Sequence, residues 1–221
     1  MENFFRSKKT TVEMAIDRGY DVGKDIEFIN NYDKLYVEHE YNEVTSRSDM
    51  FAFYKHLTNN SHMIVIFLTK NETGTQSIII NYDYIREKIM SHIGDAFDNT
   101  NAIITIVSDA PIKYAPKLVN PGTRYKHFYQ SFEETEIVYN PNKSKYTSKV
   151  KLIENPNELI KKMGIKIGET PLMTENDPIA KYYAFRAGDL VQFTRNMYEV
   201  NAYCPQQIGY RTVVEISPEI K

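Results

Sequence analysis

Two short apolar runs constrain the fold of this chain more than any other feature of its sequence. His62–Thr69 and Ala102–Ser108 are rich in β-branched residues and are far shorter than the roughly 20 apolar residues that a membrane span needs. Apolar runs of this length are typical of strands that are buried on both faces of a sheet. Between them, Asp83 can cap a helix in which apolar residues recur at every fourth position from Ile85 to Phe97. This order predicts an α/β domain in which helices pack on a mixed sheet.

Apolar spacing and turn residues predict the remaining elements of the first part of the chain. A helix is expected over Phe4–Arg18 and another over Asp49–Leu57. Short strands are expected at Ser77–Tyr82 and His127–Tyr129. Pro111–Val119 is interpreted as either a short helix or an ordered loop.

The balance of charge changes along the chain and indicates a domain boundary. Residues 1–138 contain 15 Lys and Arg against 20 Asp and Glu, whereas residues 139–221 contain 12 against 9. The change lies beside Asn140–Tyr146, a polar stretch with an Asn-Pro turn signal. We therefore expect an N-terminal α/β domain at residues 1–138 and a small α+β domain at residues 139–221. The thin core of so small a domain would gain stability from docking on a partner.

Two helix starts that contain proline organise the C-terminal part. Asn155–Glu158 has a cap residue, a proline and a glutamate in the order of a capping box, and Gly164 is suited to end the helix that follows. Asp177-Pro178 predicts a second helix of about two turns. Strands are expected at Leu190–Thr194 and Tyr210–Ile216, joined by an irregular loop.

The sequence lacks the patterns that usually accompany metal, cofactor or nucleophile chemistry. Its five histidines and its one cysteine, Cys204, do not have the spacing of a zinc site, and no glycine-rich phosphate loop or nucleophile elbow is present. A lone cysteine cannot form an internal disulfide and fits a reducing compartment. The first residues contain no apolar leader, so we expect no secretion. We expect no catalytic residue, no metal and no cofactor.

A nuclease-fold protein that binds or cleaves DNA is the alternative from the enzyme class. Some nucleases hold Mg²⁺ with an acid on one strand and an acid-x-Lys motif on the next. Ser77–Tyr82 contains neither an acid nor a lysine, and Glu87-Lys88 and Glu133-Glu134 lack that spacing. We interpret these four charges as solvated groups on the surface and do not favour the nuclease. An adaptor that binds transcription factors is a further alternative.

A basic strip interrupts the acidic N-terminal part. Pro111–His127 contains no acid and carries four cations and two tyrosines. The cations are Lys113, Lys117, Arg124 and Lys126. Such a strip could contact the phosphates of nucleic acid without reading its bases, or it could be a soluble loop, and both interpretations remain open.

The segment from Thr174 to Arg195, followed by Gly209–Val214, carries the most specific signal. It reads Asp-Pro-Ile-Ala-Lys-Tyr-Tyr, then Gly-Asp-Leu-Val and an arginine, and closes with Tyr-Arg-Thr-Val-Val. This pattern resembles the assembly domain of the fifth-subunit family of DNA-dependent RNA polymerase. That family includes the subunit shared by eukaryotic polymerases I, II and III and its smaller archaeal counterpart. The N-terminal part is similar, more loosely, to the jaw domain of the eukaryotic members.

The resemblance implies a non-catalytic polymerase subunit without a membrane partner. Its C-terminal domain would dock on the largest subunit, and its jaw would contact downstream duplex DNA, with Pro111 and the four cations of the basic strip at the tip. The implied partner-binding residues are Asp177, Lys181, Tyr182, Tyr183, Arg186, Asp189, Arg195, Tyr210 and Arg211. Their arginines supply fork-shaped donors that suit partner carboxylates or carbonyls.

Some positions depart from the family pattern. Ala184 stands where the family usually has glycine, Lys181 where arginine is common, and the loop between Arg195 and Tyr210 is longer than usual. Together with the Asn-, Ile- and Lys-rich composition, this drift suggests a virus-encoded member as a hypothesis. The protein would then be found in the host cytoplasm or the virion, and in the nucleus if it is cellular.

Overall fold

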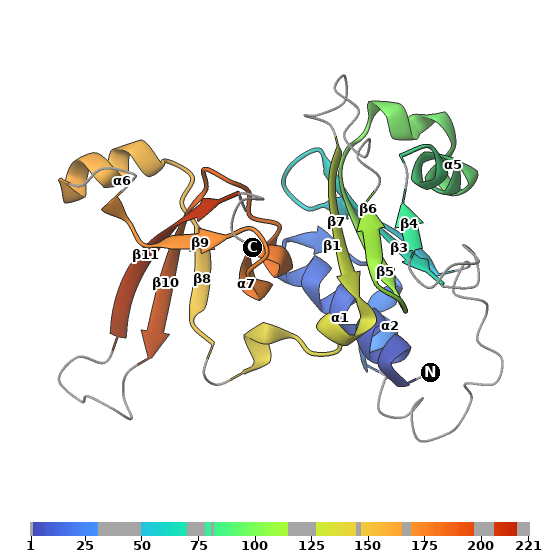
Figure 1. Ribbon diagram of the computed structural model, residues 1–221, viewed down its shortest axis with the longest axis horizontal. Helices are drawn as coiled ribbons and strands as arrows, with labels where there is room; N and C mark the ends of the chain where they lie inside the picture. Colours follow the sequence, from blue (N-terminus) through green and yellow to red (C-terminus); the bar gives the residue numbers. More distant parts are fainter. Residues whose placement is uncertain are drawn as a thin grey trace. The chain divides into compact units, whose positions relative to one another are not determined.

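The computed structural model describes residues 2–30, 50–69, 78–80, 82–114, 127–144, 147–164, 169–196 and 206–215. The chain divides into two units, Met1–Tyr139 and Asn140–Lys221. Figure 1 shows each as strands accompanied by helices. Among the helices of the described residues, none has the length and apolar character that crossing a membrane requires.

A mixed sheet of five strands forms the centre of the first unit (Figure 1). The strand order is β1 (Tyr20–Asp21), β2 (Phe51–His56), β3 (Ser61–Leu68), β5 (Asn101–Ser108) and β7 (His127–Glu133). β2 is antiparallel to β1 and β3, whereas β3, β5 and β7 run parallel. β4 (Ile78–Ile80) and β6 (Ile112–Tyr114) form a separate parallel pair. The predicted mixed α/β arrangement is confirmed for this unit.

The apolar runs are buried because side chains pack on both faces of β3. Ile64, Ile66 and Leu68 contact a cluster that includes Ile85 of α5 (Tyr82–Ile93) and Phe97 of the 3₁₀ helix η3 (Gly94–Asn99). The alternate residues Met63, Val65 and Phe67 are at most 3% exposed. The side chain of Arg18, which follows α1 (Glu2–Asp17), lies 3.8 Å from the Met63 sulfur. The other helices are α2 (Asp25–Asn30) and η4 (Glu134–Glu136), and α1 contacts η4.

Several local predictions for the first unit are wrong. The residues expected in a helix at 49–57 include β2, because alternate aromatic side chains allow this segment to pair with β3. α5 ends at Ile93 rather than continuing to Phe97, since Gly94 adopts a left-handed φ of 67°. Glu134 was expected on the surface but is only 6% exposed. In the segment 111–119, residues 112–114 are strand β6, and residues 115–119 lie outside the described ranges.

In the second unit, the described residues form a four-stranded sheet accompanied by helices (Figure 1). The strand order is β8 (Lys149–Leu152), β10 (Leu190–Asn196), β11 (Gln206–Val214) and β9 (Leu172–Thr174). β9 and β11 are parallel, and the other pairs are antiparallel. The 3₁₀ helix η5 (Pro141–Lys143) precedes the sheet, and the helices are α6 (Pro156–Met163) and α7 (Pro178–Tyr183). Val191 and Val213 form the core with Ala180 and Phe185.

The two predicted helix starts of this unit have different outcomes. Gly164 ends α6 with φ 68°, as expected, but Asn155 makes no side-chain capping hydrogen bond, so the predicted capping box is wrong there. Asn155 has φ −118° and ψ 71°, outside the usual extended backbone of a cap residue. At α7, Asp177 does cap the helix, and Pro178 stands in its first turn.

Candidate docking surface

Helix α7 starts where the Asp-Pro signal predicts and presents its two tyrosines differently. The Asp177 carboxylate accepts a hydrogen bond from the Ile179 amide at 2.9 Å, which satisfies one of the donors exposed at a helix start. Tyr182 is 2% exposed, whereas Tyr183 is half-buried, and their rings meet edge to face at 5.3 Å. The Tyr182 side chain therefore belongs to the interior of the unit.

Tyr183 connects α7 to the start of the unit. Its hydroxyl accepts a hydrogen bond from the Asn142 side-chain amide at 2.7 Å, and Asn142 lies in η5. Its ring stacks on Phe185 with the ring centres 5.3 Å apart. These contacts fix the orientation of the ring, so Tyr183 stabilises the unit whether or not its exposed edge meets a partner.

Carboxylates hold the turn between α7 and β10. Ala184 ends the helix in the left-handed conformation, with φ 56° and ψ 36°, and Gly188 has φ 96°. Asp189 accepts from the Arg186 amide at 2.7 Å, and Glu175 accepts from the Ala187 amide at 2.7 Å. Asp189 therefore positions the backbone of the turn at Arg186, and the exposed Arg186 side chain extends from this fixed turn.

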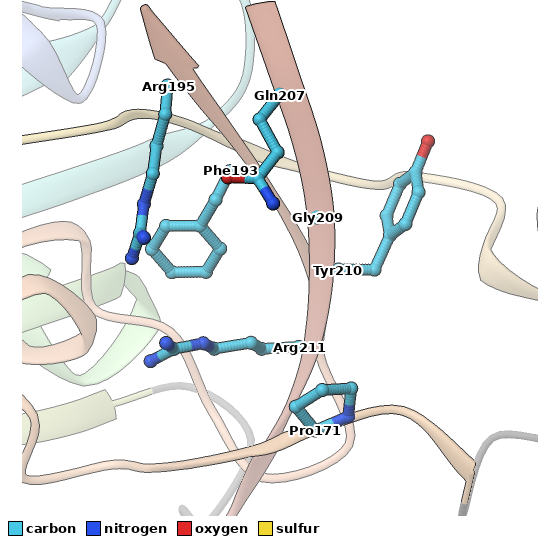
Figure 2. A pocket seen from close by; sticks show the side chains of 7 residues that line it. All are labelled: Pro171, Phe193, Arg195, Gln207, Gly209, Tyr210 and Arg211. Carbon is cyan, nitrogen blue, oxygen red and sulfur yellow. The ribbon is translucent and has the colours of Figure 1, made fainter. Parts of the chain in front are cut away.

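The register of β10 and β11 brings residues far apart in sequence onto one face. Phe193 lies opposite Gly209, and Arg195 lies opposite Gln207. Arg211, two residues beyond Gly209, lies on the same face because strand side chains alternate. These residues line a pocket of about 210 Å³ together with Pro171 and Tyr210 (Figure 2).

Two arginines flank the aromatic wall of this pocket. The guanidinium carbon of Arg211 lies 5.1 Å from the centre of the Phe193 ring, within the range of a cation–π contact. Arg195 donates from Nε to the Ser148 hydroxyl at 3.1 Å. In Figure 2 the two guanidinium groups lie on the same side of the strands, that of Arg195 beside the Phe193 ring and that of Arg211 below it, whereas the Tyr210 ring points the opposite way.

Within the described residues, no carboxylate neutralises the positive charge of this pocket. Among the described residues, neither Arg195 nor Arg211 forms an ion pair with a carboxylate. Arg211 is also half-buried, so part of its hydration is lost. Paired guanidinium groups beside an apolar ring are suited to bind a carboxylate with an adjoining apolar stem.

The structure thus separates the residues that the sequence grouped. Asp177 caps helix α7, Tyr182 lies in the core and Asp189 holds the turn. The pocket, by contrast, is lined by Arg195, Tyr210 and Arg211. Lys181 lies half-buried on α7. Sequence reasoning missed the pocket residues Pro171, Phe193, Gln207 and Gly209. Phe193 and Arg195 are two residues apart, as are Gly209 and Arg211, and residues at this spacing lie on the same face of a strand. This spacing was the signal available in the sequence.

The DNA-contact candidates lie largely beyond what the structure describes. Pro111 is exposed just before β6, and Lys113 lies in β6 opposite Ile79. Lys117, Arg124 and Lys126 lie outside the described residues. A search of the described part of the chain for three or more clustered His, Cys, Asp or Glu residues that could hold a metal ion finds no such group.

Comparison with known proteins gives matches along most of the chain. Residues 140–213 match the family model described as RNA polymerase Rpb5, C-terminal domain. Subunit 5B of DNA-directed RNA polymerases IV and V from Arabidopsis thaliana is 25% identical over 196 residues, which cover 86% of this chain and 82% of that protein. Subunit RPABC1 of DNA-directed RNA polymerases I, II and III from Caenorhabditis elegans is 22% identical over 215 residues, 95% of each chain. The corresponding protein from Caenorhabditis briggsae has the same identity and coverage.

Proposed function

The chain belongs to the fifth-subunit family of DNA-dependent RNA polymerase, and from this premise we propose that it is a non-catalytic subunit of such an enzyme. Its C-terminal domain, residues 139–221, docks on the largest subunit. Its N-terminal domain, residues 1–138, is a jaw that contacts downstream duplex DNA. Phosphodiester chemistry belongs to other subunits of the complex.

One observation carries the docking part of this proposal. The segment that matches the family model, residues 140–213, lies within the unit Asn140–Lys221. Inside that unit, the Asp-Pro helix start and the turn that follows it are held by hydrogen bonds to Asp177, Asp189 and Glu175. The most specific part of the sequence therefore coincides with a helix start and a turn whose backbone is held by side-chain hydrogen bonds, which supports its use as a docking surface.

Affinity purification tests the docking part. The tagged full-length chain, expressed where its polymerase is made, should elute with the two large polymerase subunits. Val213→Asp places a carboxylate at a fully buried core position and should abolish co-elution. The exposed Lys24 lies in the other unit, and Lys24→Glu should leave co-elution intact. Elution of the folded wild-type chain without large subunits would contradict the proposal.

The basic strip supports the DNA-contact part. Lys113 and Lys117 belong to a run of residues, 111–127, that contains no acid in an otherwise acidic half of the chain. Cations placed beside a duplex release counterions from its phosphates, which makes binding depend on salt.

A charge reversal tests this contact. Lys113→Glu with Lys117→Glu should leave assembly intact and reduce the slope of log affinity against log salt by about 1 for each phosphate that the protein no longer neutralises. The control reverses the exposed Lys24 and Lys55, which changes the net charge of the first unit by the same amount. An unchanged salt slope in the assembled complex would remove the DNA contact from the proposal.

The origin of the chain decides where it acts. The relatives described above are named as subunits of DNA-directed RNA polymerases and come from a plant and from nematodes, which supports the nucleus if the chain is cellular. A virus-encoded copy would act in the host cytoplasm or the virion, and locating the coding sequence in its source genome distinguishes the two. Because the family and these relatives are polymerase subunits, the nuclease alternative is not carried forward.

A further inference from the structure

We propose that the pocket between Arg195 and Arg211 receives an aspartate or glutamate side chain of the protein partner on which the second unit docks. This inference rests on the proposed function and adds the chemistry by which the partner is recognised. The occupant is an acidic segment of a polymerase subunit, with an apolar stem or neighbour placed against the Phe193 ring.

The size of the pocket favours a single side chain. Its volume is about 210 Å³, below the roughly 300–1,000 Å³ of sites that enclose a small molecule. The pocket is open above Gly209, where a Cβ atom would meet nothing within 4 Å. A carboxylate-bearing side chain fits such a space, whereas a nucleotide with its base and sugar needs a larger site.

The geometry of the arginines favours a carboxylate. The Nε atom of Arg195 is already directed to Ser148, so the orientation of its guanidinium is set. The face of the Phe193 ring holds the guanidinium of Arg211 at 5.1 Å. Groups oriented in advance lose little side-chain entropy when they bind, and a planar fork matches the two oxygens of a carboxylate.

Burial and charge support the same occupant. Arg211 is half-buried, and no carboxylate of the described residues pairs with it. Residues 139–221 contain 12 Lys and Arg against 9 Asp and Glu, so this part of the chain complements an acidic segment. A partner carboxylate would replace the hydration that Arg211 has lost.

Two substitutions test the pocket by independent means. Arg211→Gln removes the charge, whereas Gly209→Val fills the open space without altering charge. Gly209 is not among the residues with positive φ, and valine favours strands, so this variant should fold. Ile208 is 54% exposed and lies on the opposite face of β11, so Ile208→Val is the matched control.

The assay is a competition for incorporation into polymerase. Each tagged variant is co-expressed with differently tagged wild type, and mass spectrometry gives their ratio in the purified complex. We expect Arg211→Gln and Gly209→Val to be under-represented at least tenfold and Ile208→Val to remain at parity. Parity of Gly209→Val with wild type would overturn the inference, even if the chain is a polymerase subunit. Urea unfolding of each purified variant establishes that its fold is retained.

Photo-crosslinking identifies the occupant. A benzoylphenylalanine at the exposed Gln207, on the lip of the pocket, should crosslink in the purified polymerase to a subunit peptide with an aspartate or glutamate within a few residues. A crosslink to nucleic acid, or to a peptide without an acidic residue, would overturn the inference while leaving docking intact. Absence of large subunits from the preparation would overturn both proposals together.

Discussion

Replacing Ala184 with glycine should stabilise the second unit, because this alanine ends α7 in a conformation that suits glycine. Its φ of 56° and ψ of 36° lie in the left-handed region, where an L-residue costs roughly 1–2 kcal/mol. Glycine adopts this region without that cost. The Phe185 amide donates to the Ala180 carbonyl at 3.0 Å across this turn, so the backbone is not free to relax away from it.

Two smaller effects oppose the gain. Glycine widens the unfolded ensemble, which costs roughly 0.4–1 kcal/mol. Removing the methyl group of the half-buried Ala184 costs about 0.4 kcal/mol, half the value of a fully buried group. The balance is a stabilisation of roughly 0.5 kcal/mol, or an increase in melting temperature of about 2–4 °C for a unit of this size.

Gly164 provides the reverse substitution in the same unit. It ends α6 with φ 68°, and a Cβ atom there would meet nothing within 4 Å, so Gly164→Ala tests the backbone effect without steric interference. We expect a destabilisation of about 1 kcal/mol.

Urea unfolding followed by circular dichroism measures both changes, and hydrogen exchange of peptides from residues 178–190 assigns them to the second unit. Lower stability of Ala184→Gly, or changes of the same sign in both variants, would refute the reasoning.

Three further substitutions probe individual hydrogen bonds. Tyr183→Phe leaves the Asn142 amide without this acceptor, and the melting temperature should report a loss of about 1 kcal/mol in the second unit; an unchanged value would show that water replaces the contact. Asp177→Ala removes the cap of α7 and should cost about 1 kcal/mol in urea unfolding, whereas Asp177→Ser should retain most of the stability. Burial, the charge of Asp25 and the hydrogen bond to it raise the pKa of Tyr54 above the ordinary value of about 10. The free energy of unfolding that Tyr54 contributes is therefore fully present below about pH 10 and declines as the pH rises above it. In Tyr54→Phe, the stability of the first unit should fall less steeply with pH in this alkaline range. A pH profile identical to that of the wild type would contradict this assignment.

The strands of the first unit were predictable where burial alone determines them. The apolar run that becomes β3 is buried on both faces, so its composition identifies it without knowledge of its neighbours. β2 was mistaken for a helix because the aromatic spacing of so short a segment fits both periods: Phe51 and Phe53 fit a strand, and Phe51 and Tyr54 fit a helix. Its pairing with β3, which composition does not encode, decides its conformation.

The candidate site was predictable in its turn but not in its pocket. Asp177, Pro178 and Gly188 act through their immediate neighbours, so local signals were sufficient to identify the helix start and the turn. The pocket depends on Phe193 lying opposite Gly209, and that register depends on where β10 and β11 pair along their lengths. Sequence reasoning identified both arginines as donors but could not place them in one pocket.

The contact between α1 and η4 has a consequence for synthesis of the protein. α1 begins at Glu2 and η4 ends at Glu136, so the first and last elements of the unit meet. During translation, α1 can contact β1 and α2 early, but its contact with η4 forms only when about the whole unit has left the ribosome, at roughly 5–20 residues per second. β7, the last strand of the parallel set, emerges immediately before η4. A nascent chain halted before residue 127 would therefore lack both β7 and the surface that η4 offers to α1, so the unit completes its packing only after this stage.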